Sequence, residues 1–218
     1  MQDRQIHRVV RSIRACVRQW QLPAVERVRG DSPDPFQVLI ACLLSLRTKD
    51  EVTEPAARHL LARARTPQQI LSLPIPRIAR LIYPVCFYRV KARGLHKLCQ
   101  HLIGRFRGRV PDTLEELLTL PGVGRKTANL VLTVGFGKPG ICVDVHVHRI
   151  SNRLGYVKTR DPHETEMALR EKLPARYWME YNTLLVAFGQ HLCRPVSPWC
   201  SRCPVKPLCG RVGVTSNR

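Results

Sequence analysis

A lysine within a glycine-containing turn is the residue of this chain with the clearest chemical potential. Lys126 lies in the segment Leu120-Pro-Gly-Val-Gly-Arg-Lys-Thr-Ala128, between one helical pattern that ends before it and another that begins within it. The start of a helix disfavours a cation, so helix stability does not explain a lysine there. Lysine amines act as Schiff-base nucleophiles, and Lys126 is a candidate for that role.

The residues around Lys126 have the composition of a tight hairpin between two helices. Thr113 can cap the first helix, and Glu116, three residues later, is placed to complete a capping box. Pro121 ends that helix, and we expect both Gly122 and Gly124 to adopt the positive φ angles of the turn.

The backbone amides of Gly122, Gly124 and Arg125 are expected to point outward at the start of the second helix. Amides in this position, together with the helix dipole, form a site for an anion. A nucleic-acid phosphate suits the site, and such a contact positions a duplex without reading its sequence. The alternative is a plain turn, in which Pro and Gly only interrupt the helices.

Four cysteines near the C-terminus have the spacing C-x6-C-x2-C-x5-C: Cys193, Cys200, Cys203 and Cys209. Thiols this close together, in a chain whose nine cysteines are an odd number for a disulfide framework, indicate a metal centre in a reducing compartment. Structural zinc usually takes two separated cysteine pairs. One pair with two flanking single cysteines favours a 4Fe–4S cluster, with zinc and unligated cysteines as the alternatives.

The net charge points to a polyanionic partner. Lys and Arg number 36 against 16 Asp and Glu, which gives a formal charge of +20, and the basic residues are spread along the chain. A folded basic face for nucleic acid is therefore expected rather than a basic tail. The alternative is a protein that is merely basic.

No run of 18 apolar residues is present, so no membrane span is expected. The arginine-rich N-terminus could be mistaken for a transit peptide. Apolar residues recur there at helical spacing, at Ile6, Val9, Val10, Ile13, Val17 and Trp20. We therefore expect an amphipathic helix that packs on the protein, rather than a targeting segment. The expected location is accordingly the cytoplasm, in association with the nucleoid, as in a prokaryotic-type protein.

Helical patterns separated by Pro- and Gly-containing breaks, such as residues 30–35, cover most of the chain, so the predicted fold class is all-α. The segment 141–150 is the exception. Its β-branched residues alternate with period two and favour a strand, whereas Asp144 could instead cap a helix that runs through Arg153.

Three motifs in this order give the chain a resemblance to endonuclease III, of the helix-hairpin-helix DNA glycosylase superfamily. They are the segment 120–128, the segment Val143-Asp-Val-His146, and the cysteine loop that follows Phe188-Gly189-Gln190. The resemblance covers nearly the whole chain. It implies two helical domains with a DNA cleft between them: a six-helix barrel at 28–138 that contains the hairpin at about 113–136, and an iron–sulfur cluster domain formed by 1–27 and 139–218.

The resemblance also implies an activity and its residues. The family removes oxidised pyrimidines from duplex DNA and nicks the strand at the abasic site by β-elimination. Lys126 matches the family's nucleophile and Asp144 its catalytic aspartate, while Ser45 and His146 match positions of the base pocket. His146 could instead be an ordinary hydrogen-bonded histidine. Double-stranded DNA with damaged bases or abasic sites is the expected partner, and a monomer is expected.

Two expected DNA-binding residues depart from the bacterial pattern. Arg47 stands where those enzymes usually have a glutamine that fills the gap left by the flipped base, and arginine can donate to guanine O6 and N7. Phe87 stands where a leucine wedge is usual and could intercalate; otherwise it is a buried loop anchor. Arg47 therefore keeps open a mismatch glycosylase for thymine or uracil opposite guanine, and a non-catalytic DNA-binding protein is the remaining alternative.

Overall fold

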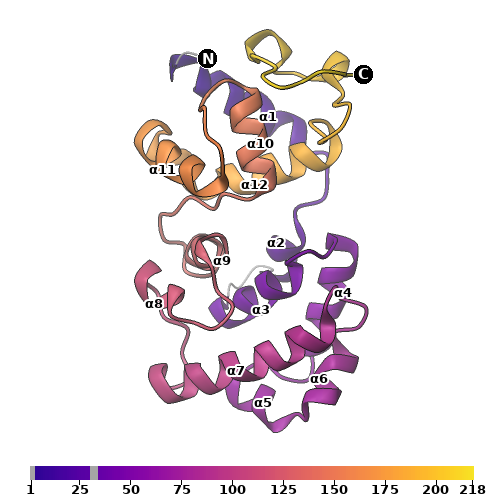
Figure 1. Cartoon of the computed structure of the whole chain (residues 1–218), viewed down its shortest axis with the longest axis vertical. Coiled ribbons are helices and arrows are strands. Elements are labelled where there is room, and N and C mark those ends of the chain that lie inside the picture. Colours follow the sequence, from indigo (N-terminus) through magenta and orange to yellow (C-terminus); the bar gives the residue numbers. More distant parts are fainter. Residues whose placement is uncertain (1–2, 30–33) are drawn as a thin grey trace. The chain divides into compact units, whose positions relative to one another are not determined.

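The computed structural model describes residues 3–29 and 34–218, and within them it contains helices and no strand. The all-α prediction is confirmed. Most of the break expected at residues 30–35 lies outside the described residues. The chain divides into two compact units, which we call the internal unit (Ala24–Gly140) and the terminal unit (Met1–Pro23 with Ile141–Arg218) (Figure 1). None of the described helices combines the length and apolar character that a membrane crossing requires.

The internal unit is built around α3 (Pro35–Ser45), whose side chains from Val38 to Leu44 are all buried. The sequence of this helix is almost uninterruptedly apolar, which is typical of a helix that neighbours cover on several sides. It packs against α2, α4, α7, α9 and the π-helical turn η2. The remaining bounds are α2 (Ala24–Arg29), α4 (Asp50–Leu61), α5 (Pro67–Ser72), α6 (Ile75–Leu81), α7 (Tyr88–Phe106), α8 (Leu114–Leu118), α9 (Arg125–Leu130) and η2 (Val131–Gly135).

A polar side chain caps α8 as the sequence predicts, with one difference from the expected capping box. Thr113 accepts from the Glu116 amide at 3.3 Å, which is the forward half of the capping box. The Glu116 carboxylate then accepts from the Thr113 hydroxyl at 2.9 Å, in place of the Thr113 backbone amide. A direct bond between the two side chains closes the first turn of α8.

The terminal unit joins both ends of the chain in one core. Its main helices are α1 (Ile6–Val17), α10 (Val145–Arg153), α11 (Pro162–Lys172) and α12 (Trp178–His191), with short 3-10 turns η1 (Asp3–Gln5), η3 (Ala175–Tyr177), η4 (Cys200–Arg202) and η5 (Lys206–Leu208). α12 packs against α1 and α10, and α10 packs against α11. The predicted amphipathic N-terminal helix is confirmed, since its apolar stripe from Ile6 to Val17 is buried in this core.

The strand expected at 141–150 is wrong, and the competing helix is found. Asp144 is the N-cap of α10. Burial follows a helical period along this segment, because Val147, Ile150 and Leu154 are at most 1% exposed, whereas Val145 is 66% exposed. The alternation of β-branched residues is only local, and packing against α11 and α12 decides the conformation.

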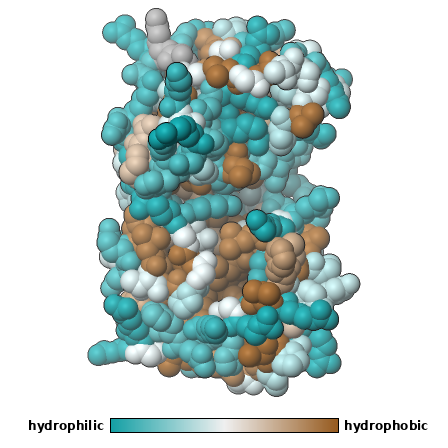
Figure 2. Space-filling view, in the orientation of Figure 1, coloured by the Kyte–Doolittle hydropathy of each residue, from teal (hydrophilic) through white to brown (hydrophobic). Residues whose placement is uncertain are grey.

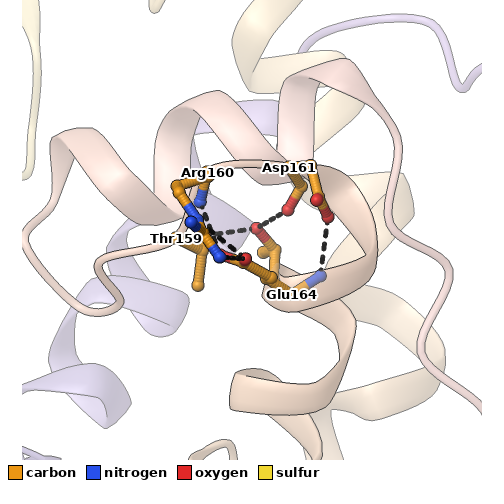
Figure 3. A network of polar contacts seen from close by, with 5 residues as sticks. Thr159, Arg160, Asp161 and Glu164 are labelled. Atoms are coloured by element: carbon orange, nitrogen blue, oxygen red, sulfur yellow. Dashed lines mark hydrogen bonds and ion pairs between the residues drawn. The ribbon is translucent and has the colours of Figure 1, made fainter.

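A polar network fixes the start of α11 (Figure 3), and one of its members, Thr165, also contacts α10. Asp161 caps α11 by accepting from the Glu164 amide at 2.8 Å, and Arg160 pairs with the Glu164 carboxylate. The Thr165 hydroxyl donates to the Asp161 carbonyl and lies 2.7 Å from His148 Nδ1 on α10. This contact gives His148 a structural role between the two helices.

Candidate functional site

The hairpin between α8 and α9 presents bare backbone. Gly122 has the expected positive φ of 78°. The expectation for Gly124 is wrong: its φ is −101° because it is the extended N-cap of α9. A Cβ built on either glycine meets no atom of the described residues within 4 Å. Packing inside the protein therefore does not demand glycine at 124, and the open face of the turn is available to another molecule.

Lys126 lies in the first turn of α9 and is half-buried, with Arg125 beside it. Its charge acts on Cys42 of α3, a buried thiol. Burial raises the pKa of Cys42 to about 12, and the Lys126 charge opposes that rise. The amine is thus near enough to α3 for its charge to act on a buried thiol of that helix.

Arg47 and Phe87 occupy equivalent places in two turns, which we call the paired turns (Ser45–Thr48 and Val85–Tyr88). Thr48 N donates to Ser45 O at 3.0 Å, and Tyr88 N donates to Val85 O at 3.0 Å. In each turn the third residue is left-handed, with φ 56° at Arg47 and 57° at Phe87.

A side chain larger than glycine or asparagine is uncommon in this conformation. The Arg47 guanidinium nevertheless lies over the Phe87 ring, 6.0 Å from its centroid. Phe87 is 56% exposed, so its reading as a buried loop anchor is wrong.

Ser45 ends α3, next to these turns. Its hydroxyl donates to the Cys42 carbonyl at 2.7 Å, a local bond that satisfies the end of the helix. The side chain is half-buried.

Asp144 holds the first turn of α10 in the terminal unit. Its Oδ1 accepts from the amides of His146 and Val147, both at 2.9 Å, and the residue is 9% exposed. Both capping bonds go to one oxygen. The carboxylate can therefore cap the helix and present its second oxygen, Oδ2, for other contacts.

His146 belongs to a chain of contacts that reaches the cysteine loop. Its Nδ1 lies 3.0 Å from Arg149 Nη2, which also donates to the Cys193 carbonyl at 2.9 Å. A guanidinium only donates, so Nδ1 is the acceptor and the proton of the neutral imidazole is on Nε2. Burial lowers the pKa of Arg149, and its Nε is a buried atom without a hydrogen-bond partner in the described structure.

The predicted metal ligands line one cavity. Cys193, Cys200, Cys203 and Cys209 surround it with apolar neighbours, and its empty volume, which includes open solvent, is about 390 Å³. Burial raises the pKa of Cys203 to about 11. In the described part of the chain, no three His, Cys, Asp or Glu side chains converge as ligands of a metal ion.

Arg153 fixes this cysteine loop to the end of α10. Its guanidinium donates to the carbonyls of Arg194 and Pro195, each at 2.6 Å, and Nη1 lies 3.6 Å from the Cys193 sulfur. The amide of Arg211 donates to the Cys209 sulfur at 3.4 Å. Donors directed at sulfur stabilise a thiolate more than a thiol.

Arg149, Arg153 and Gly189 were not predicted from the sequence as site residues. The two arginines are four positions apart and share a face of α10. The helical reading of 145–153 is the signal that could have identified them.

The chain has clear relatives of known type. Residues 40–175 match the HhH-GPD family, described as HhH-GPD superfamily base excision DNA repair protein. Endonuclease III of Thermotoga maritima is 51% identical over 176 residues, which are 81% of this chain and 83% of that enzyme. Endonuclease III-like protein 1 of Mus musculus is 46% identical over 177 residues, 80% of this chain, which spans only 59% of that longer protein.

Two solved structures have the same fold. A non-covalent endonuclease III–DNA complex matches with a TM-score of 0.85 and 33% identity, over 96% of this chain and 95% of that chain. A trapped covalent endonuclease III–DNA intermediate matches with a TM-score of 0.79 and 34% identity, over 96% of each chain.

Gly189 tests the contact between His146 and Arg149. A Cβ at this position would lie 2.9 Å from Arg149 Nη2 and still closer to His146 Nδ1. Gly189→Ala is expected to displace this pair and to lower the free energy of unfolding by about 1–3 kcal/mol, measured by urea denaturation. Gly104→Ala is the matched control, since its Cβ meets no described atom within 4 Å; it should be neutral or stabilising. Equal effects of the two variants would contradict the close approach.

Proposed function

This chain belongs to the endonuclease III family, within the HhH-GPD superfamily of base excision DNA repair proteins, and we propose that it removes oxidised pyrimidines from duplex DNA as a bifunctional DNA glycosylase and AP lyase. The observation that carries the proposal is Lys126 at the start of α9, behind a hairpin of bare backbone. A protein that only binds DNA has no need of an amine in this unfavourable place.

In the proposed reaction the Lys126 amine first displaces the base, and the iminium that it forms then promotes elimination of the 3′ phosphate. The damaged nucleotide first leaves the base stack. Lys126 Nζ then attacks C1′ of its sugar, the bond from C1′ to the base breaks, and the base departs. The sugar ring opens to an iminium between Nζ and C1′. Loss of a proton from C2′ then expels the 3′ phosphate, which nicks the strand, and water hydrolyses the iminium to free the enzyme.

Asp144 is proposed to assist the first step. Its carboxylate is proposed to aid deprotonation of the attacking amine and to stabilise the positive charge that develops on the sugar. Because both capping bonds are made by Oδ1, this role does not require the start of α10 to unfold.

The DNA contacts are proposed to divide between backbone and base recognition. The amides of Gly122, Gly124 and Arg125 bind a phosphate of the duplex, and the formal charge of +20 supports further phosphate contacts. Phe87 is proposed to wedge between base steps, and Arg47 to occupy the gap left by the extruded nucleotide. His146 Nε2–H is proposed to donate to the extruded base, and the Ser45 hydroxyl, whose hydrogen goes to the Cys42 carbonyl, is proposed to accept from it.

The cysteine loop is proposed to hold a 4Fe–4S cluster as a structural group. The donor set fits, since four thiols line one largely apolar cavity and Arg153 and the Arg211 amide approach two of the sulfurs. The four sulfurs line the cavity without converging on one point, which would suit a cluster better than a single zinc ion. When bound, the cluster would supply positively charged iron that compensates the buried thiolates and cross-links the loop.

A mismatch glycosylase for thymine or uracil opposite guanine is the second candidate. The exposed guanidinium of Arg47 supports it, because arginine pairs well with guanine O6 and N7.

Lys126→Gln tests the nucleophile. Borohydride reduces an iminium to a stable amine, so wild type is expected to give a covalent adduct with duplexes that carry thymine glycol or an abasic site, and the variant none. Nicking should fall by roughly 10³-fold or more. Trapping by wild type on the abasic duplex alone would keep the lyase and favour the mismatch reading. An adduct of undiminished yield with Lys126→Gln would refute the assignment.

Asp144→Ser separates catalysis from helix capping. Serine caps about as well as aspartate, so the free energy of unfolding should stay within about 0.5 kcal/mol of wild type, whereas Asp144→Ala should lose about 1 kcal/mol. Single-turnover base release should fall by roughly 10²-fold or more in both variants. If Asp144→Ser keeps full activity, the carboxylate is only a cap.

Cys203→Ser tests the cluster. The purified wild-type protein is expected to be brown, with about four iron atoms per chain and broad absorption near roughly 400 nm. The variant should lose most of the iron and absorption. Cys16→Ser, which removes an isolated thiol on α1, is the control and should keep both. Stoichiometric zinc in a colourless wild-type protein would overturn the assignment.

A further inference from the structure

The paired turns are connected to each other by a network that the proposed function has not used. The Thr48 hydroxyl, in the first turn, accepts from the Cys86 amide of the second turn at 3.2 Å. The same hydroxyl donates to the Leu46 carbonyl at 3.3 Å. A side chain 38 positions away along the chain thus fixes the backbone directly before Phe87.

Lys91 completes this network from the first turn of α7. Its ammonium donates to the carbonyls of Leu44 and Leu46, at 2.7 and 2.6 Å, and to the Thr48 hydroxyl at 3.2 Å. Its own amide donates to the Phe87 carbonyl at 2.9 Å. Lys91 therefore binds the residues on both sides of Arg47 through its side chain, and Phe87 through its backbone.

The position of Lys91 is costly for a cation. Burial lowers its pKa to about 8, and the nearby Cys86 opposes this shift. Buried charges are retained where fixed acceptors compensate the lost hydration. The acceptors here are the last carbonyls of α3 and of the turn that follows it, which attract a cation through the helix dipole as well.

The conformations that Lys91 supports are themselves unfavourable. Left-handed backbone at a residue other than glycine costs on the order of 1 kcal/mol and persists where the surroundings enforce it. Arg47 and Phe87 both adopt it, and their side chains meet in a cation–π contact. Tyr83 and Val90, on either side of Phe87 in the sequence, are also more than half exposed. Figure 2 shows hydrophobic residues gathered among hydrophilic ones on the face of the internal unit that it displays.

We propose that Lys91 is a positioning residue that locks the paired turns into one rigid probe, so that Arg47 and Phe87 enter the DNA together at the extruded nucleotide. The inference rests on the proposed function and deepens it. Extrusion of a base leaves an unpaired partner base and an unstacked step, and the two side chains fill these places at the same time. A probe assembled before binding loses less conformational entropy than two separately ordered loops.

The test is a mutant cycle read on two substrates. Lys91→Met keeps the length of the side chain and removes its donors. Its kcat/KM on a duplex lesion is expected to fall on the order of 10- to 100-fold. Borohydride trapping on a single-stranded abasic site, where no gap opens, should stay within about twofold. In an Arg47→Ala/Phe87→Ala background, Lys91→Met should cost less than about a further twofold, because residues that act as one unit are not additive.

Two further variants keep the result interpretable. Lys97→Met removes an exposed charge from the same helix and should leave all readouts within about threefold, the change expected from one unit of the overall positive charge. Thr48→Val changes no residue of α7 but removes the hydroxyl that accepts from both Lys91 and the Cys86 amide, and should repeat the pattern of Lys91→Met even if that variant folds poorly.

A direct signal comes from 2-aminopurine placed opposite a tetrahydrofuran abasic analogue. Wild type should increase its fluorescence by unstacking it, and both Lys91→Met and Thr48→Val should lose most of that increase. Full additivity in the Arg47→Ala/Phe87→Ala background, or an equal loss on the single-stranded substrate, would overturn the inference. Failure of wild type to trap on any abasic substrate would instead refute the proposed function.

Discussion

One carboxylate oxygen fixes where α10 begins, and the placement of the terminal unit's proposed functional residues depends on that start. Asp144 Oδ1 accepts from the amides of His146 and Val147 in the first turn of α10, while packing against α11 and α12 holds the rest of the segment as a helix. The helix then places His146 near its start, and Arg149 and Arg153 on the turns that face the cysteine loop. A proposed catalytic group and a proposed metal site are thereby attached to the two ends of one nine-residue element.

In the internal unit, two residues with unfavourable left-handed backbone angles lie where DNA is proposed to bind. Arg47 and Phe87 hold conformations that glycine would adopt without strain. Glycine would leave neither a guanidinium nor a ring at those positions. The hairpin shows the reverse arrangement. Gly124 has an extended conformation that any residue could adopt, yet it carries no side chain. Side chains are therefore present where the proposal requires insertion, and absent where it requires close approach of a phosphate.

Local patterns predicted the helices but not every conformation or contact. The apolar stripe of α1 and the cap at Thr113 were readable because residues three and four apart decide them. The local alternation at 141–150 favoured a strand although a helix forms there, because neighbours distant in the chain determine the buried face of this segment. The left-handed paired turns and the role of Lys91 could not be predicted, since they rest on contacts that span 38 to 47 positions. The roles of Lys126, Asp144 and the cysteines remain predictions.

The terminal unit is assembled from both ends of the chain, and this has a consequence for its biosynthesis. The apolar stripe of α1 is covered by α12, which leaves the ribosome long after α1 does. At about 5–20 residues per second, roughly 160 intervening residues delay that contact by about 8–32 s. Before this interval ends the internal unit has its whole sequence, whereas an arginine-rich amphipathic helix still waits without its partner. The nascent chain is therefore most vulnerable to aggregation and to chaperone capture at its first helix.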